Sequence, residues 1–560
     1  MLAGGSLAGK RLGPCPPISN HPALLADGSG LALDHISSRL TRQTSIEAML
    51  VVVDAPLPPL RPIRKQHAWQ WLPIPPQPSV LASLDAALAR VNSEQVLVQP
   101  ITTLPPDPLP NGSWIGLGEQ PLPREDWSAV SALGTKHPRF HHKRDPIDQQ
   151  APECHPFTGL IQAPAALLRE LLGQRRDHPS WSAEADQDLL SLAEWLHARH
   201  AARLETMPWL DLGHRATASR RRLSRLSSRG FNSVRYCRDG DLIEKHSQNQ
   251  QRLAQEAAYF SALPQPLQRF FPACLHHQPG RLDLEYVPFP SAAELFLHWR
   301  IGPNGWLQLM ERLAGIREAL ACEATSTPSP KADVRWLYSQ KLLQRLQQLN
   351  AQPPLLPGEH GWNTWWVTPW TLELSASKPG QPMQQISLPA PQTAVATLAQ
   401  HLPALERERP LQRIHGDLCF NNILAEPLSG SIRLIDPRGE TPEGASWPIG
   451  FGDPRYDQVK LLHSGRYLYD VVVNDLFELE LIAPAHLRLR LDVPDHYADV
   501  QQAMERSGLL HSLTQNEEQW LTASLFFSML PLHREDGERC LAFVAIGLMI
   551  LSNRFSAVLQ

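Results

Sequence analysis

The chain has 560 residues, of which 42% are hydrophobic and 19% charged, and its formal net charge is −4 at pH 7. This composition supplies enough apolar residues for buried cores and excludes an intrinsically disordered chain. The slightly acidic balance argues against a protein that binds nucleic acid or anionic membranes, because such proteins are usually basic.

Residues 1–222 have the pattern of an α/β domain. Short apolar runs predict strands at Ala48–Val53 and Gln95–Val98, and amphipathic spacing predicts a helix at Ser79–Val91 between them. A second helix is predicted at Asp186–Arg203. Because helices that lie between strands are typical of βαβ units, we expect a parallel sheet.

Both ends of this region contain segments that resemble motifs of sugar nucleotidyltransferases. Residues 1–12 (MLAGGSLAGKRL) are similar to the glycine-rich loop in which the backbone cradles the nucleotide, and residues 21–36 are similar to a segment that follows that loop. Residues 209–214 (WLDLGH) resemble a motif whose aspartate, here Asp211, binds metal. The resemblance implies a Rossmann-like nucleotidyltransferase fold for residues 1–222.

This region departs from the nucleotidyltransferase pattern at three places. The first loop has one residue too many between its glycines, and Asn20 and His21 stand where a lysine is expected. The metal-binding aspartate expected after the central strand is absent from residues 96–102. Because two-metal catalysis is not expected with Asp211 alone, we predict a degenerate domain that binds a sugar nucleotide without turning it over.

The next region begins with the pattern of a small antiparallel sheet. It follows a segment with six arginines, residues 215–229, which could be a nucleic-acid patch but fits better as a solvated connection between domains. A hairpin is predicted from Ser233–Tyr236 and Asp241–Lys245 around an Asp-Gly turn. A helix at Gln251–Leu263 and a strand at Arg281–Val287 follow.

The strongest functional signal is the sequence Ile414–Leu424 (IHGDLCFNNIL), which is followed by Asp436. Asn422 comes five residues after Asp417, and a predicted hairpin would return Asp436 to the same loop. Transfer of a phosphoryl group needs an acceptor for the hydroxyl proton and oxygen ligands for a divalent metal. We therefore expect Asp417 to act as the base and Asn422 and Asp436 to bind Mg²⁺. The alternative is that the two aspartates only cap a turn and end a strand.

This ordered set resembles the catalytic loop and metal motif of the aminoglycoside phosphotransferase and choline kinase family. The resemblance implies a bilobal α+β fold similar to protein kinases, with an N-lobe at about residues 223–290 and a C-lobe at about residues 291–560. It also implies ATP and Mg²⁺ as cofactors. His415 would support the loop that carries Asp417.

The same resemblance implies an ATP site in the N-lobe. Lys245, at the end of a predicted strand, would contact the α- and β-phosphates, and Glu256 on the next helix would orient Lys245. A loop would hold phosphate and a hinge would bind adenine through its backbone; the residues assigned to them are Ser228, Gly230, Asn232, Glu285 and Val287. The alternatives are a solvated Lys–Glu pair and an ordinary turn between domains.

In the predicted C-lobe, the pattern Gly452–Asp457 (GDPRYD) indicates a helix start, with Asp453 as N-cap and Pro454 at the first helical position. In the family that this region resembles, the first aspartate of the pattern braces the catalytic loop. Apolar helices are predicted at Trp520–Leu530 and Cys540–Leu551. They would form the acceptor cleft or pack in the core.

Cysteine usage and apolar runs favour a cytoplasmic protein. No two of the seven cysteines form a CxxC pair, so we expect neither a disulfide framework nor a zinc site and predict a reducing compartment. No apolar segment typical of a signal peptide occurs near the N-terminus. The longest apolar run, Leu541–Leu551, has 11 residues and is too short to cross a bilayer.

Three segments bear on the chain as a whole: WLDLGH…RLSSRGFNS between the halves, IDPRG, and GDPRYDQVKLLHS. They resemble bacterial capsular polysaccharide biosynthesis proteins. We predict an ATP-dependent phosphotransferase that acts on a hydroxyl of a sugar or another small polar metabolite. The alternatives are a sugar-phosphate nucleotidyltransferase with an accessory kinase half, and a pseudokinase that binds nucleotide without catalysis. The sequence leaves the acceptor and the oligomeric state open.

Overall fold

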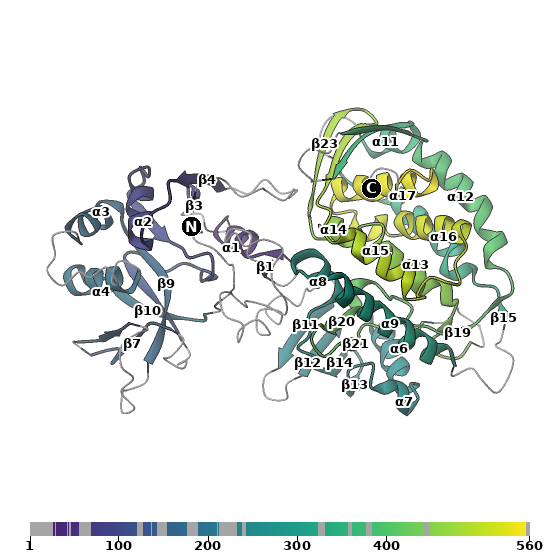
Figure 1. Ribbon diagram of the computed structural model, residues 1–560, viewed down its shortest axis with the longest axis horizontal. Coiled ribbons are helices and arrows are strands. Elements are labelled where there is room, and N and C mark those ends of the chain that lie inside the picture. Colours follow the sequence, from purple (N-terminus) through teal and green to yellow (C-terminus); the bar gives the residue numbers. More distant parts are fainter. Residues whose placement is uncertain are drawn as a thin grey trace. The chain divides into compact units, whose positions relative to one another are not determined.

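The computed structural model describes residues 26–27, 30–41, 43, 46–54, 69–119, 127–135, 137–142, 154–175, 189–209, 211, 232–237, 242–322, 331–356, 361–376, 383–440 and 447–555. These residues form two compact units, one that ends at Asp211 and one that begins at Asn232 (Figure 1). Residues 1–12, residues 215–229 and the Asp-Gly turn of the predicted hairpin lie outside the described residues.

The first unit contains a mixed sheet. In spatial order its strands are β10 (Arg203–Met207), β6 (Trp114–Gly118), β9 (Cys154–Pro164), β7 (Ala129–Ser131) and β8 (Arg139–His141), and β5 (Gln95–Val98) also pairs with β9. The strands β10 and β6 are parallel, whereas β9 is antiparallel to β5, β6 and β7. The long strand β9 therefore organises this sheet.

The predicted helix between two strands is present, but the two strands belong to different sheets. Strand β3 (Met49–Asp54) pairs in parallel with β4 (Trp69–Ile74), and β5 pairs with β9. Strand β4, which the sequence does not predict, comes between β3 and α2 (Val80–Leu88) in the chain and pairs with β3. The prediction of one parallel sheet is therefore wrong, although both strands and the helix are where the sequence predicts them.

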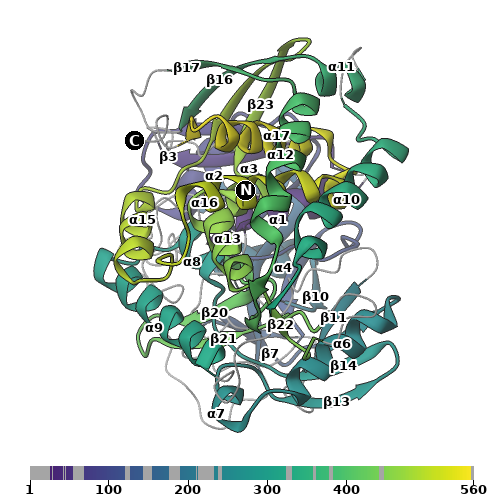
Figure 2. The same cartoon turned by 90° about the vertical axis from the view of Figure 1, so that its right-hand side faces the viewer.

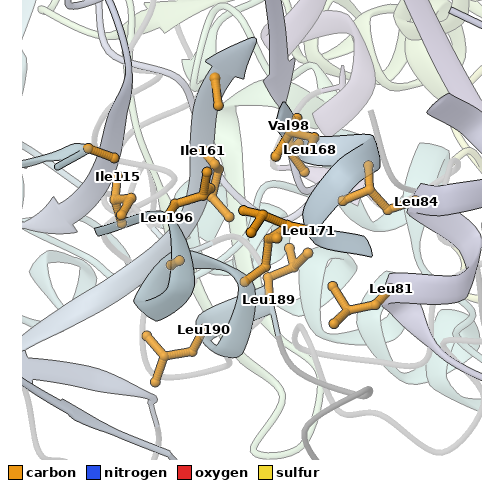
Figure 3. Packing of buried hydrophobic residues seen from close by; sticks show 14 of the residues in the cluster. Leu81, Leu84, Val98, Ile115, Ile161, Leu168, Leu171, Leu189, Leu190 and Leu196 are labelled. Carbon is orange, nitrogen blue, oxygen red and sulfur yellow. The ribbon is translucent and has the colours of Figure 1, made fainter. Parts of the chain in front are cut away.

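Buried aliphatic side chains from three helices form the core of the first unit against β9. The helices are α2, α3 (Ala165–Gln174) and α4 (Leu189–His200). Figure 3 shows Leu196 of α4 beside Ile161 of β9, and Leu171 of α3 in the middle of the cluster between Ile161 and Leu84 of α2. The remaining elements of this unit are β1 (Ala26–Asp27), β2 (Gly30–Leu31) and α1 (Ala32–Thr41).

The second unit begins with an antiparallel sheet of the kind predicted for an N-lobe. In spatial order its strands are β11 (Asn232–Cys237), β12 (Leu242–Ser247), β14 (Arg281–Glu285) and β13 (Cys274–Gln278). Strands β11 and β12 form the predicted hairpin. Helix α6 (Gln250–Ser261) follows β12 and contacts β13 and β14, and α7 (Gln265–Gln268) comes next.

The rest of the second unit is mainly helical, as predicted. Helix α17 (Gly537–Leu551) contains the predicted core run, is almost wholly buried and packs against α16 (Gln515–Ser528). The other helices are α8 (Ala292–His298), α9 (Pro303–Cys322), η6 (Arg335–Leu337), α10 (Ser339–Ala351), α11 (Trp362–Val367), α12 (Pro391–Glu406), η7 (Phe420–Asn422), α13 (Pro454–Gly465), α14 (Tyr469–Val473), α15 (Tyr497–Arg506) and η8 (Leu530–His533). Within the described ranges, we find no helix whose length and apolar character would let it cross a bilayer.

A second sheet of this unit includes two strands from residues 353–391, a Trp- and Pro-rich stretch in which the sequence predicts no element. In spatial order its strands are β17 (Gln384–Leu388), β16 (Trp370–Ala376), β24 (His486–Leu491) and β23 (Phe477–Ala483). Figure 2 shows β16, β17 and β23 at one end of the unit, with β13 and β14 at the other.

Short strand pairs connect the helices of the second unit. The hairpin predicted after the catalytic loop is formed by β20 (Ile423–Glu426) and β21 (Ser431–Leu434), with Ile423 opposite Leu434. The other pairs are β19 (Gln412–Arg413) with β22 (Phe451–Gly452) and β15 (Lys331–Ala332) with β18 (Arg409–Pro410). Strand β19 leads directly into the predicted catalytic loop.

A buried ion-pair network holds the start of α13. Arg455 is 2% exposed, and its guanidinium lies 2.5 Å from Asp453 and 2.6 Å from Glu517. The Tyr338 hydroxyl donates a hydrogen bond to Asp453 at 3.3 Å. Asp453 also accepts the N–H of Arg455 at 3.0 Å, so it is the N-cap that the sequence predicts.

We expect Arg455→Met to lower the free energy of unfolding by about 3–5 kcal/mol, because the buried Asp453 carboxylate loses its counter-ion. Urea unfolding followed by circular dichroism measures this change. The control Arg490→Met removes an exposed ion pair with Glu478, and it should cost less than about 1 kcal/mol. Equal losses in the two variants would contradict the importance of the buried network.

Candidate active site

The loop that carries Asp417 is held by a buried carboxylate of α13. Asp457 is 2% exposed, and its two oxygens accept the backbone N–H groups of His415 at 2.7 Å and Gly416 at 2.8 Å. The family resemblance implied such a brace from Asp453, the first aspartate of the GDPRYD pattern, whereas the sequence pattern itself indicated a helix cap. Asp453 caps the helix, and Asp457, one turn further along α13, reaches the loop.

His415 joins the loop to the segment that follows β21. Its buried ring places Nε2 3.0 Å from the Ile435 carbonyl oxygen, and Nδ1 accepts the Asp417 N–H at 3.3 Å. Burial lowers the pKa of His415 even though carboxylates lie nearby, so the ring is neutral and Nε2 is the donor. The N–H of Arg438 donates to the His415 carbonyl oxygen at 2.8 Å. These contacts support the loop around Asp417.

Three residues of the predicted site meet at one backbone junction. The Asn422 carbonyl oxygen accepts the Ile435 N–H at 3.0 Å, where the β20–β21 hairpin closes. The Asn422 Nδ2 group donates to the Asp417 carbonyl oxygen at 2.8 Å. Asp436 follows Ile435 with a left-handed backbone, at φ 59°. The hairpin therefore brings Asp417, Asn422 and Asp436 together.

Lys245 links the N-lobe sheet to this junction. Its Nζ lies 2.7 Å from both carboxylate oxygens of Glu256 on α6 and 2.8 Å from Oδ1 of Asp436. Burial raises the pKa of Glu256 to about 7, although the Lys245 charge opposes this shift. Burial disfavours an ionised Asp436, but the charge and hydrogen bond of Lys245, together with the charge of Arg252, lower the pKa of Asp436. The ammonium group therefore lies between two carboxyl groups of different elements.

Two cations that the sequence analysis did not single out hold the Asp417 side chain. Arg438 Nη2 lies 2.5 Å from Oδ2, and Lys460 Nζ lies 2.9 Å from Oδ1. Arg438 also lies 3.5 Å from Asp436. Burial disfavours the charge of Lys460, but Asp417 outweighs this effect and raises the pKa of Lys460. The sequence could have indicated Lys460, because this residue comes three positions after Asp457 and therefore lies on the same face of the helix.

The other residues assigned to nucleotide binding are placed only in part. Ser228 and Gly230 lie outside the described residues, and Asn232 is the first residue of β11. Glu285 ends β14, and its N–H donates to a backbone carbonyl at 2.9 Å, so this N–H is not available to adenine. Val287 is 9% exposed and lies two residues further along. The phosphate loop and the hinge therefore stay predictions.

In the first unit, the Asp211 side chain accepts a hydrogen bond from another side chain. Asp211 is 5% exposed, the indole N–H of Trp127 donates to its Oδ2 at 3.2 Å, and its backbone forms a bridge to Thr103. Across the described residues of the chain, we find no group of three His, Cys, Asp or Glu side chains that could hold a metal ion. Asp211 therefore has a structural partner where the resemblance implies a metal ligand.

A cavity of about 250 Å³ lies next to the catalytic loop but does not include Asp417. Its lining includes Arg317 of α9, Gln412 of β19, Asp457 of α13 and His511. Asp457, which accepts hydrogen bonds from the loop backbone, forms part of the wall of this cavity. Its lining includes none of Asp417, Asn422 and Asp436.

Residues 302–471 match the Phosphotransferase enzyme family. This part of the chain belongs to that family. The match includes Asp417, Asn422 and Asp436, whereas Lys245 lies before it. The link between Lys245 and the phosphotransferase residues is therefore a result of the structure, not of the match.

Several solved structures are similar to this chain. A choline/ethanolamine kinase family protein from Mesorhizobium loti has a TM-score of 0.31 and 14% identity, over 60% of this chain and 91% of its own. A glucosamine kinase has a TM-score of 0.35 and 13% identity, over 60% and 82%. HddC from Yersinia pseudotuberculosis has a TM-score of 0.27 and 13% identity, over 39% and 95%. None of the curated proteins matches the sequence.

We expect Asp457→Ala to loosen the loop of the phosphotransferase part, because two backbone N–H groups lose their buried acceptor. The free energy of unfolding should fall by about 2–4 kcal/mol, and the amides of His415 and Gly416 should exchange with solvent faster than their neighbours. Hydrogen–deuterium exchange with mass spectrometry measures the second effect. Asp495→Ala, which changes an exposed aspartate, should change neither quantity. Unaltered exchange at the loop in Asp457→Ala would reject the brace.

Proposed function

We propose that the second unit is an ATP-dependent kinase that transfers the γ-phosphate to a hydroxyl of a sugar or another small polar metabolite. The observation that carries this proposal is the junction at which Lys245 and Asp436 form an ion pair beside Asn422 and Asp417. Phosphoryl transfer relies on positioned charges more than on covalent chemistry by the protein, and this junction supplies both signs of charge. The family match of residues 302–471 supports the same chemistry.

In this proposal, Asp417 is the general base. As the acceptor oxygen forms its bond to the γ-phosphorus, the bond from that phosphorus to the bridging oxygen of ADP breaks and ADP leaves, and the hydroxyl proton passes to the Asp417 carboxylate. Lys460 and Arg438 each contact one oxygen of that carboxylate, which fixes its orientation. A positioned base of this kind contributes about 100- to 10,000-fold to a rate.

Asn422 and Asp436 would hold Mg²⁺, and their geometry fits this ion. Because the Asn422 Nδ2 group donates to the backbone of Asp417, its amide oxygen is the atom that can bind a metal. Asp436 adds carboxylate oxygens that are about one-third exposed. Mg²⁺ prefers such hard oxygen ligands and takes the rest from water and phosphates. When bound, the ion would neutralise charge on the phosphates.

Lys245 would bind the phosphates of ATP, and Glu256 would orient Lys245. The supporting contact is the 2.7 Å ion pair between Lys245 of a strand and Glu256 of a helix, a pairing that is typical of kinase ATP sites. Backbone and short polar side chains of the preceding loop and the hinge would complete the site. The residues that we propose for these roles are Ser228, Gly230, Asn232, Glu285 and Val287.

The first unit, within residues 1–222, would be a degenerate nucleotidyltransferase-like domain. The bond from Trp127 to Asp211 supports a loss of metal catalysis, because the carboxylate already has a protein partner. A nucleotidyltransferase-like domain joined to a sugar kinase would suit cytoplasmic steps of capsular or surface polysaccharide biosynthesis. The supporting observation for this pathway is the sequence resemblance of the segments between and within the two halves.

We expect Asp417→Asn to lower kcat by about 100- to 10,000-fold, because the base is lost while the shape is kept. The assay screens sugars and small alcohols with Mg²⁺-ATP and follows ADP release on the acceptor with the highest turnover. Affinity for Mg²⁺-ATP should stay within about threefold of wild type. The control Asp333→Asn changes an exposed aspartate and should keep full activity. Equal turnover by Asp417→Asn and wild type would remove the assigned base.

We expect Asp436→Asn to weaken ATP binding in the presence of Mg²⁺ by at least about tenfold, because a charged metal ligand becomes neutral. Titration calorimetry with and without EDTA separates this effect from metal-independent binding. In EDTA the variant should bind ATP at least as well as wild type, since a negative charge near the phosphates is gone. An unchanged dependence on Mg²⁺ would contradict the metal role of Asp436.

A further inference from the structure

A cavity of about 430 Å³ lies in the second unit between α9, the segment that follows α7 and the β20–β21 hairpin. Figures 1 and 2 both show α9 and α7 near this hairpin. The described residues that line the cavity include none of Asp417, Asn422 and Asp436. They also do not include Asp457, so this cavity is separate from the proposed catalytic junction and from the cavity beneath the loop.

Three arginines from three elements line this cavity. They are Arg269 after α7, Arg312 of α9 and Arg433 of β21. The described lining contains no aspartate or glutamate, and the carboxylate of the hairpin, Glu426, lies outside the lining and accepts the Ser429 N–H at 2.6 Å. The lining therefore carries three positive charges that no lining carboxylate offsets.

Neutral groups hold two of these guanidinium groups in place. Arg312 Nη1 donates to the Ser429 carbonyl oxygen at 2.7 Å, and Arg433 Nη1 donates to the Ile432 carbonyl oxygen at 3.2 Å. Gly430 at the hairpin turn is required for the first contact, because a Cβ atom there would clash with the Arg312 guanidinium. Each guanidinium has five N–H donors, so donors remain for an anion that enters the cavity.

Much of the remaining lining is apolar. It includes Phe270, Ile316 of α9 and Ile432 of β21. The Arg269 guanidinium lies over the Phe270 ring, 4.7 Å from its centre. Planar guanidinium groups and aromatic rings both stack on the flat faces of nucleobases. The cavity therefore combines positive charge for phosphates with surfaces that suit a base.

The wall of this cavity continues into the strand that leads to Asp436. The Phe270 carbonyl oxygen accepts the Leu434 N–H at 2.7 Å, which ties the segment after α7 to β21. Arg433 directly precedes Leu434, and Asp436 comes two residues after Leu434. A ligand that binds Arg433 would therefore stabilise the backbone that sets the position of Asp436.

We propose that this cavity is a second nucleotide site, which binds a nucleoside diphosphate that takes no part in phosphoryl transfer. The diphosphate would contact Arg312 and Arg433, and the base would stack on Arg269. The cavity volume of about 430 Å³ is larger than a free phosphate needs and falls within the range of about 300–1,000 Å³ that is typical of small-molecule sites. Binding here is independent of the proposed function, whereas a regulatory effect through Asp436 rests on that function.

The test titrates UDP and GDP into the full chain while Mg²⁺ and a non-hydrolysable ATP analogue fill the ATP site. We expect at least one of the two to bind with a Kd below about 1 mM, and Arg312→Gln and Arg433→Gln each to weaken this binding by about tenfold. Pyrophosphate and the matching nucleoside, which each carry one part of the ligand, should bind at least about tenfold more weakly. The control Arg534→Gln changes an exposed arginine outside the lining and should bind as wild type does.

A cavity-filling variant tests the same site with all three arginines kept. Gly315 of α9 lines the cavity, and a Cβ atom there would have no described heavy atom within 4 Å. Gly315→Leu should therefore fill the cavity and weaken nucleotide binding at least about tenfold, without a lower Tm, because leucine is favoured over glycine in a helix. In wild type, the bound nucleotide should slow hydrogen exchange at the amides of residues 431–434, and this effect should be absent in Gly315→Leu.

The proposed site is rejected if neither nucleotide binds below about 1 mM. Equal binding by wild type, both arginine variants and Gly315→Leu would also reject it, because the nucleotide would then bind elsewhere on the chain. Pyrophosphate binding as tight as that of the nucleotides would overturn the nucleotide class, and unaltered exchange at residues 431–434 would overturn the link to Asp436. Nucleotide binding at the cavity in a chain that phosphorylates no alcohol would instead reject the proposed function and leave the second site standing.

Discussion

The rest of the proposed site depends on the carboxylate of Asp457, which is buried beneath the catalytic loop. Burial raises the pKa of Asp457, whereas the N–H groups of His415 and Gly416 oppose this shift. A buried charge costs several kcal/mol unless hydrogen bonds compensate it, so the loop must present both N–H groups for α13 to pack here. This requirement sets the path of the backbone into Asp417. The same helix then supplies Lys460, which holds the Asp417 side chain.

Ion pairs between side chains of opposite charge hold the groups proposed for catalysis in place. Lys245 lies between Glu256 and Asp436, and Asp417 lies between Arg438 and Lys460. Within such a network each ion has a partner from another element, so the N-lobe sheet, the hairpin and α13 are connected through side chains as well as backbone. Pre-organised charges of this kind need little rearrangement during phosphoryl transfer, which is where a kinase obtains most of its rate.

The two units differ in what their acidic residues do. In the second unit, Asp417 and Asp436 form ion pairs with basic side chains beside the backbone junction of Asn422 and Ile435. In the first, Asp211 is buried and accepts a hydrogen bond from Trp127, so its carboxylate has become part of the packing. A chain with these two features would retain nucleotide chemistry in one half and binding in the other.

The sequence by itself determined the elements whose causes are local. The strand Gln95–Val98, the helix α2 and the hairpin that returns Asp436 follow from apolar spacing and turn residues close together in the chain. Only the tertiary structure decided which distant residues meet. It paired Lys245 with Asp436 across 191 positions, gave the brace to Asp457 instead of Asp453, and joined β5 to β9 instead of β3. Such contacts depend on how whole elements pack and on which buried groups need partners, and no local pattern of residues contains that information.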